Sequence, residues 1–384
     1  MTHIFLKDMV YRRTRVVMTT IGIVVLITLI LLLGGIMNGM RIQVQQYIRS
    51  TEANLWISAE GSGGGFTGFS LLVPEYLVFI NHTEGVKRNS VSPLIFAHAR
   101  PVINGKATKS IVVGYKRGKL GGPTQTIPNQ GRMFTPSQYD DYRPEDQPPA
   151  EVVIDEKMRT PSGGKIPIGG KIYIGGTELN VVGRTKSLMF VLDTPLLFMD
   201  LRTAQEVLLK NSLHVNMMIA KTESDYSVEA LAEELDQNGM IEAKTLDQTL
   251  TSIIENYVDE PMKAVQFLRI MLWLAAGIIV TMISYVTTLE KTREIGTLKA
   301  IGASDYYIMM LILKQVILMS SAGVILGVFS AFLSANLAPI FVKIDLLETS
   351  VVAIISFVVC CSGGYFASRK ALDVDPMIAF RGEI

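Results

Sequence analysis

Four long apolar blocks constrain this chain more than any other feature of its sequence. They run from about Val16 to Met40, Val265 to Leu289, Tyr306 to Leu337 and Val351 to Ala367. A helix needs roughly 17–25 mostly apolar residues to cross a bilayer, and each block reaches that length. Only 18% of the 384 residues are charged, whereas soluble domains carry about 25%. The blocks therefore predict an α-helical membrane protein with four transmembrane helices.

Basic residues in the short flanks of these blocks predict their orientation, because cytoplasmic flanks are enriched in Lys and Arg. These residues fall in three flanks: Lys7, Arg12, Arg13 and Arg15 before the first block, Lys291, Arg293 and Lys299 between the second and third, and Arg369, Lys370 and Arg381 after the fourth. With four helices, all three flanks lie on one side of the membrane. We expect a multi-pass protein of the inner or plasma membrane with both termini in the cytoplasm. The first block is too long for a signal-peptide core and is expected to remain as an anchor.

Between the first and second helices, the sequence predicts an inserted extracytoplasmic α+β domain. Its composition is mixed, and short β-branched runs alternate with turn residues. The segments that favour regular structure are strands at Val152–Ile154 and Val215–Ala220, a hairpin of Lys171–Ile174 and Leu179–Val182 around Gly175–Gly176, and a helix at Ser227–Leu235. Arg41–Arg49 and Leu246–Tyr257 are expected to extend the first two membrane helices outward.

The whole chain divides into nine expected segments. They are a cytoplasmic basic amphipathic helix at 1–15, the first transmembrane helix with its outer extension at 16–50, the extracytoplasmic domain at 51–245, a stalk and the second transmembrane helix at 246–289, a cytoplasmic coupling segment at 290–304, the third transmembrane helix at 305–337, a short outer loop at 338–350, the fourth transmembrane helix at 351–368 and a cytoplasmic tail at 369–384.

No catalytic or metal site is predicted. His82, His98 and His214 lack the spacing of metal ligands, and no Ser-His-Asp or Cys-His grouping is recognisable. The adjacent Cys360 and Cys361 lie inside an apolar run and are expected to pack as small hydrophobic residues. A net charge of +1 gives no electrostatic support for binding nucleic acid.

The segment between the second and third blocks carries the most functional information. As a short helix it places Ile295, Leu298 and Ile301 along one edge and its charges on the opposite side, and Gly302 then supplies a C-terminal cap. Gly296 in the helix interior costs about 1 kcal/mol relative to Ala. Close approach of another protein surface would explain it. The alternative is a solvated basic loop that only fixes the topology.

The run Glu290-Lys291-Thr292-Arg293-Glu294-Ile295-Gly296-Thr297-Leu298-Lys299-Ala300-Ile301-Gly302-Ala303-Ser304 resembles the signature of the MacB/FtsX-like ABC transporter permeases. The four-helix layout, the large outer domain and the C-terminal residues Ala371–Ile384 agree with that family, and the chain is most similar to its DevC/HrtB branch. The resemblance implies a coupling helix that docks into a separate ATPase subunit. The residues assigned to this role are Glu290, Arg293, Glu294, Ile295, Gly296, Leu298, Lys299 and Gly302.

The resemblance also implies the partners and the activity. The chain is expected to be a transport subunit without enzymatic activity or a cofactor of its own, while two ATPase copies hold ATP and Mg²⁺. A second copy of the chain, membrane lipid and, in a cell with an outer membrane, a periplasmic adaptor complete the assembly. The expected function is export or extraction of a hydrophobic or amphipathic substrate: haem, lipid or glycolipid, lipoprotein, peptide or drug. The alternative is an FtsX-like regulator that activates an extracytoplasmic partner without moving a solute.

Unusual residues inside the apolar blocks are candidates for two further sites, a substrate or lipid contact and a dimer contact. Arg269 is costly in a bilayer, and it is predicted either to contact substrate or anionic lipid or to reach the interface by snorkelling. Gly35 and Gly39 form a Gly-x3-Gly pair, which predicts a close helix contact in a homodimer.

Overall fold

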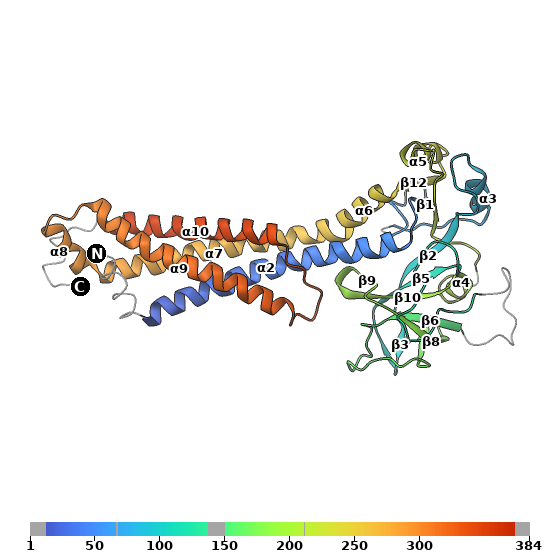
Figure 1. Ribbon diagram of the computed structural model, residues 1–384, viewed down its shortest axis with the longest axis horizontal. Helices are drawn as coiled ribbons and strands as arrows, with labels where there is room; N and C mark the ends of the chain where they lie inside the picture. Colours follow the sequence, from blue (N-terminus) through green and yellow to red (C-terminus); the bar gives the residue numbers. More distant parts are fainter. Residues whose placement is uncertain (1–12, 67, 137–149, 211, 373–384) are drawn as a thin grey trace. The chain divides into compact units, whose positions relative to one another are not determined.

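The computed structural model describes residues 13–66, 68–136, 150–210 and 212–372, and the chain divides into two compact units. The helical unit combines Met1–Gly39 with Met262–Ile384, and the α/β unit is Met40–Pro261 (Figure 1). Most of the predicted basic helix at 1–15 and of the predicted tail at 369–384 lies outside the described residues.

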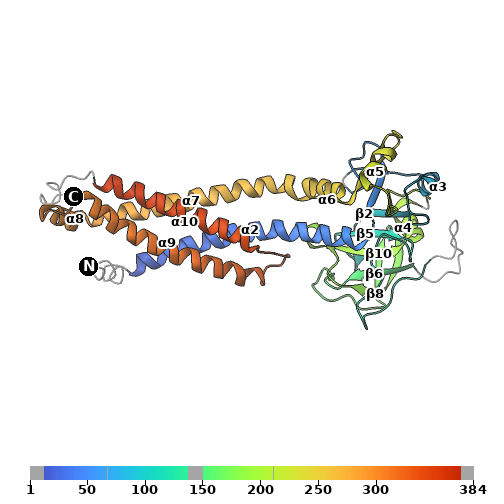
Figure 2. The same cartoon turned by 45° about the horizontal axis from the view of Figure 1, so that its top comes forward.

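Four described helices are long and apolar enough to cross a membrane, and they match the four predicted blocks. They are α2 (Arg13–Ser50), α7 (Glu260–Glu290), α9 (Asp305–Ala335) and α10 (Leu346–Leu372). In the helical unit these helices lie side by side in two views (Figures 1 and 2). Their shared core includes Ile23, Ile27, Val280 and Val316. The short helix α8 (Thr292–Ala300) connects α7 to α9.

Both helical extensions predicted beside the membrane helices are present. Helix α2 continues without a break to Ser50, because its sequence there contains no helix-breaking residue. On the other side, α6 (Leu246–Ile254) begins with a capping box, in which Thr245 and Gln248 satisfy each other's backbone N–H groups. A π-helical turn, η2 (Glu255–Asp259), then leads from α6 into α7.

The α/β unit is built on one mixed sheet, whose order within the described residues is β12-β1-β11-β2-β5-β10-β6-β8-β7-β3-β4, with β9 paired to β10. The strands are β1 (Leu55–Ala59), β2 (Ser92–Ala99), β3 (Val102–Ile103), β4 (Lys106–Ala107), β5 (Ser110–Tyr115), β6 (Ala150–Asp155), β7 (Lys171–Ile174), β8 (Thr177–Thr185), β9 (Met189–Phe190), β10 (Thr194–Asp200), β11 (Met217–Ala220) and β12 (Ile241–Thr245). The β10–β5 and β6–β8 pairs are parallel, and the other named pairs are antiparallel. The smaller helices are α3 (Glu75–His82), η1 (Val191–Asp193), α4 (Leu201–Leu209) and α5 (Val228–Asp236).

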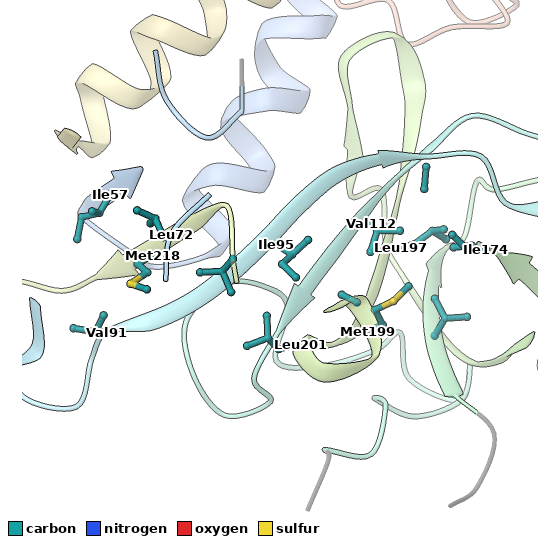
Figure 3. Close-up of a cluster of buried hydrophobic side chains, with 14 of the residues drawn as sticks. Ile57, Leu72, Val91, Ile95, Val112, Ile174, Leu197, Met199, Leu201 and Met218 are labelled. Carbon is teal, nitrogen blue, oxygen red and sulfur yellow. The ribbon is translucent and has the colours of Figure 1, made fainter. Parts of the chain in front are cut away.

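Both faces of the central strands β2, β5, β10 and β6 are largely buried, whereas β7 and β4 expose side chains. One face, drawn in Figure 3, packs residues such as Ile95, Val112 and Met199 against the first turns of α4 and against α5. The other face packs aromatic side chains against Tyr47 on the α2 extension and against Leu250 on α6. Strands buried on both faces favour continuous runs of Val, Ile and Leu rather than strict alternation. The α2 extension therefore belongs to the core of the α/β unit.

The structure confirms the predicted local elements of the α/β unit. Gly175 and Gly176 both have positive φ angles, 59° and 89°, and they turn the β7–β8 hairpin as expected. Ser227 caps α5 by accepting the N–H of Ala230. Strand β11 begins two residues later than the predicted Val215, because the side chain of Asn216 bonds to the backbone N–H and carbonyl of Phe96 on β2.

A buried carboxylate organises the end of β6. Asp155 accepts the backbone N–H groups of Lys157 at 2.9 Å and Leu188 at 2.7 Å. Each carboxylate oxygen therefore has its own backbone donor. Burial raises the pKa of this carboxyl, and its hydrogen-bond donors offset the rise only in part.

Replacing Asp155 with Asn should destabilise the α/β unit by about 2 kcal/mol, because an amide N–H would then face a backbone N–H. The measurement is urea unfolding followed by Trp56 fluorescence in a Trp273→Phe background, since the chain has only these two tryptophans. Glu178→Gln, which removes a partly exposed ion-pair partner of Lys171, is the control and should leave the midpoint nearly unchanged. An equal midpoint for wild type and Asp155→Asn would contradict this role of Asp155.

Candidate coupling site

Helix α8 is held in place by backbone geometry at both ends. At its start, the N–H of Ile295 donates to the carbonyl of Lys291 at 2.8 Å. At its end, Gly302 has φ +97°, its N–H donates to Lys299, and the N–H of Ala303 donates to Leu298. This pair of bonds is a Schellman motif. The cap predicted at Gly302 from the sequence is confirmed.

The connection from α8 to α9 is also fixed. Ser304 caps α9 by accepting the N–H of Tyr307, and Lys299 forms an ion pair with Asp305 at 2.8 Å. Helices α8 and α9 are therefore expected to move together, because the capped turn and the ion pair constrain most of the backbone dihedral angles between them.

Helix α8 exposes part of the apolar edge that was predicted. Leu298 is 37% exposed and Ile301 is 85% exposed, while Ile295 is half-buried. Gly296 is buried and Glu294 is exposed. The turn after α7 thus presents apolar side chains to the outside, where a solvated loop would present polar ones.

Lys291, which is not among the residues predicted to contact the ATPase, is buried at the start of α8. Its side chain is only 7% exposed, and it lines a small cavity with Thr287 and Thr288 of α7 and Gln315 of α9. Buried Lys is rare in proteins. The sequence signal was the pair of threonines three and four residues before it, which extend one polar stripe along α7.

The conformation of Gly302 gives a direct prediction. A Cβ atom built there meets no atom within 4 Å, so the cost of a side chain comes from the backbone alone. Gly302→Ala should weaken the cap by about 1 kcal/mol, because L-residues disfavour positive φ. The check is hydrogen exchange, which should become faster at the amides of residues 302 and 303. Ala303→Ser in the same turn should leave exchange unchanged, and equal exchange in both variants would contradict the prediction.

Arg269 forms an ion pair that is not evident from the sequence. Its guanidinium group lies 2.7 Å from the carboxylate of Glu348 on α10, and Asn38 on α2 donates to the same carboxylate at 2.6 Å. The side chains of Arg269 and Glu348 are 12% and 22% exposed. Gly34 makes room for the pair, since a Cβ atom there would lie 2.1 Å from Glu348 Oε1. The cluster links α2, α7 and α10 and gives Arg269 a counter-ion within the chain, while its contact with substrate or anionic lipid stays a prediction.

The two glycines predicted at a dimer contact lie against their own chain. A Cβ atom at Gly35 would meet Val342 at 2.6 Å, and one at Gly39 would meet the backbone oxygen of Phe341 at 2.3 Å. The backbone N–H of Lys343 also donates to the carbonyl of Gly35 at 2.8 Å. This contact with the α9–α10 connection explains both glycines within one copy of the chain.

The three histidines are far less buried than the core. His82 is exposed, with Nδ1 2.7 Å from the carbonyl of Val78, and His98 is exposed on β2. His214 is half-buried and contacts the hydroxyl of Ser212. In the part of the chain that the structure describes, no group of three His, Cys, Asp or Glu side chains is arranged to hold a metal ion.

Comparison with known families identifies the family to which this chain belongs. Four apolar helices joined to an α/β unit define the class of multi-pass membrane proteins. Residues 16–238 match the model of the MacB-like periplasmic core domain, and residues 267–376 match that of the FtsX-like permease C-terminal domain. The chain belongs to the MacB/FtsX-like family of ABC transporter permeases.

Named relatives agree with this family. An uncharacterized ABC transporter permease of Mycobacterium tuberculosis is 21% identical over 377 residues, which cover 98% of each chain. The hemin transport system permease protein HrtB of Staphylococcus epidermidis is 23% identical over 234 residues, 60% of this chain and 63% of the relative. ABC permease subunits of this kind are not themselves ATPases, and the family implies an ATPase partner.

Two solved structures are similar at low identity. The periplasmic region of MacB from Actinobacillus actinomycetemcomitans has a TM-score of 0.37 and 15% identity, covering 56% of this chain and 98% of the other. The extracellular domain of the transporter YknZ from Gram-positive bacteria has a TM-score of 0.33 and 15% identity, covering 45% and 89%.

Proposed function

We propose that this chain is the membrane subunit of an ABC exporter, which couples ATP hydrolysis in a separate subunit to export or extraction of a hydrophobic or amphipathic substrate. Helix α8 is the element through which force passes between the two subunits. Residues 290–304 dock into the ATPase, and the connected helices α7 and α9 carry the resulting motion.

The observation that supports this proposal best is the exposed apolar edge of α8. Leu298 and Ile301 project from a helix that is fixed by a Schellman motif and by the Lys299–Asp305 ion pair. An apolar edge on a well-anchored helix is suited to helix-in-groove binding, because little conformational entropy is lost on association. Glu294 is exposed on the same helix and can add a polar contact.

The proposed assembly contains two copies of this chain and two ATPase subunits, since four helices from one chain do not enclose a solute path. We place both termini and α8 in the cytoplasm and the α/β unit outside, inserted between the first two membrane helices. The basic residues flanking the helices support this orientation. Haem is one candidate substrate, because the relative HrtB is named for hemin transport.

The test is to purify the tagged chain gently from native membranes and to identify by mass spectrometry what accompanies it. A stoichiometric ATPase whose hydrolysis rises with an amphipathic substrate supports the exporter. ATPase stimulation only by an extracytoplasmic protein would identify a regulator instead. Absence of an ATPase in several detergents would overturn the docking role of α8.

A further inference from the structure

A cavity of about 410 Å³ opens in the α/β unit, in a region that the proposed coupling through α8 does not involve. It lies between α3, the loop that follows β5 and the first turn of α4. Leu201 and Met218, labelled in Figure 3, belong to its lining. This volume falls in the range of small-molecule pockets, which is about 300–1,000 Å³.

The polar part of the lining is strongly cationic. The lining contains four cations, which are Lys116, Arg117, Lys119 and Arg202, and one carboxylate, Asp200. The Asp200 side chain accepts the N–H of Arg202 at 3.0 Å, where it caps α4. The first turn of α4 adds the positive end of a helix dipole. The lining therefore has an excess of positive charge.

Two of these cations bond only to neutral groups among the described residues. Arg117 donates to the carbonyl of Phe134 at 3.2 Å, and Lys119 donates to the carbonyl of Asn89 at 2.8 Å. A carbonyl oxygen carries no net charge, so both cations can still attract an anion. Their bonds also hold the side chains in position, which lowers the entropy lost on binding.

The rest of the lining is apolar. Val215 and Met218 are almost fully buried at the base, Leu77 is half-buried, and Leu213 is 43% exposed at the rim. A ligand with only a charged group would leave this apolar surface in contact with water, and a ligand with only a hydrocarbon chain would place no anion beside Arg117 and Lys119. The two halves of the lining together fit a molecule that has both parts.

We infer that this cavity binds a small amphipathic anion: a phosphate or carboxylate head that contacts Arg117 and Lys119, with a short hydrocarbon tail against Leu77 and Leu213. Charge-assisted hydrogen bonds would fix the head, and burial of the tail would supply the hydrophobic part of the affinity. This site concerns the α/β unit alone and does not depend on the docking of α8.

The test uses the full chain in lipid nanodiscs and a cysteine at the rim, Leu213→Cys, in a background where Cys360 and Cys361 are replaced by alanine. Octyl phosphate is the probe. It should slow the reaction of this cysteine with a charged maleimide, while octanol and inorganic phosphate should do so at least tenfold less effectively. Ile168→Cys, an exposed site elsewhere on the unit, should show no protection.

Charge variants complete the test. The double variant Arg117→Gln/Lys119→Gln should raise the half-protecting concentration of octyl phosphate at least tenfold. Lys106→Gln/Lys109→Gln, which removes two exposed charges outside the lining, should change it less than twofold. The inference is overturned if octyl phosphate gives no protection, if octanol protects equally well, or if both double variants respond alike.

Discussion

Replacing both Leu298 and Ile301 with aspartate should release the ATPase from this chain, with an affinity loss of at least about 100-fold, or roughly 3 kcal/mol. Both side chains are exposed in the free chain, so the change removes little packing from α8 itself. In the proposed complex they would be buried, and two carboxylates would then lose their hydration without a partner. The measurement is the amount of ATPase retained per chain after affinity purification, together with titration of the purified subunits.

The matched control carries aspartates at Leu337 and Leu346. These residues are 81% and 73% exposed and lie at the α9–α10 connection, away from α8. The control should retain the ATPase as the wild type does. If the Leu298/Ile301 variant keeps both its thermal midpoint and its ATPase, the exposed edge of α8 is not the docking surface.

Replacing Glu348 with alanine should destabilise the helical unit by about 3 kcal/mol, because it leaves the charge of Arg269 buried without a counter-ion. The same change removes the acceptor of Asn38 and opens the space beside Gly34. The check is the thermal unfolding midpoint of the full chain in a fixed detergent.

Two further variants separate charge from packing in this cluster. Arg269→Met combined with Glu348→Leu should recover most of the stability, since removing both charges abolishes the desolvation cost. Lys343→Ala, an exposed charge in the α9–α10 connection, should leave the midpoint unchanged. A wild-type midpoint for Glu348→Ala would show that the ion pair contributes nothing to stability.

The elements that the sequence predicted correctly depend on neighbours along the chain. The apolar blocks are visible because a membrane helix needs a fixed length of apolar residues. The β7–β8 hairpin is visible because Gly175–Gly176 can adopt positive φ angles. The edge of α8 is visible because Leu298 and Ile301 are three residues apart and so lie on one face of a helix.

The relations that the sequence did not predict join residues distant in the chain. Glu348 and Arg269 are on different helices, and no periodicity in one segment identifies an ion pair with another. The contact of Gly35 with Val342 was not predicted, because small residues predict close approach without identifying what approaches, and the contact with a second copy stays a prediction. The strand order of the sheet, with β1 between β11 and β12, has no signal in the strands themselves.

That strand order delays the folding of the α/β unit while the chain is being synthesised. Strand β1 ends at Ala59, yet its two partners, β11 and β12, begin only at Met217 and Ile241. At synthesis rates of 5–20 residues per second, roughly 10 to 30 s pass before β1 can pair. During that interval its edges are unpaired and its apolar side chains are uncovered. A binding factor or fast completion of synthesis would protect β1 during this interval, and truncation anywhere before β12 leaves β1 without at least one of its neighbours.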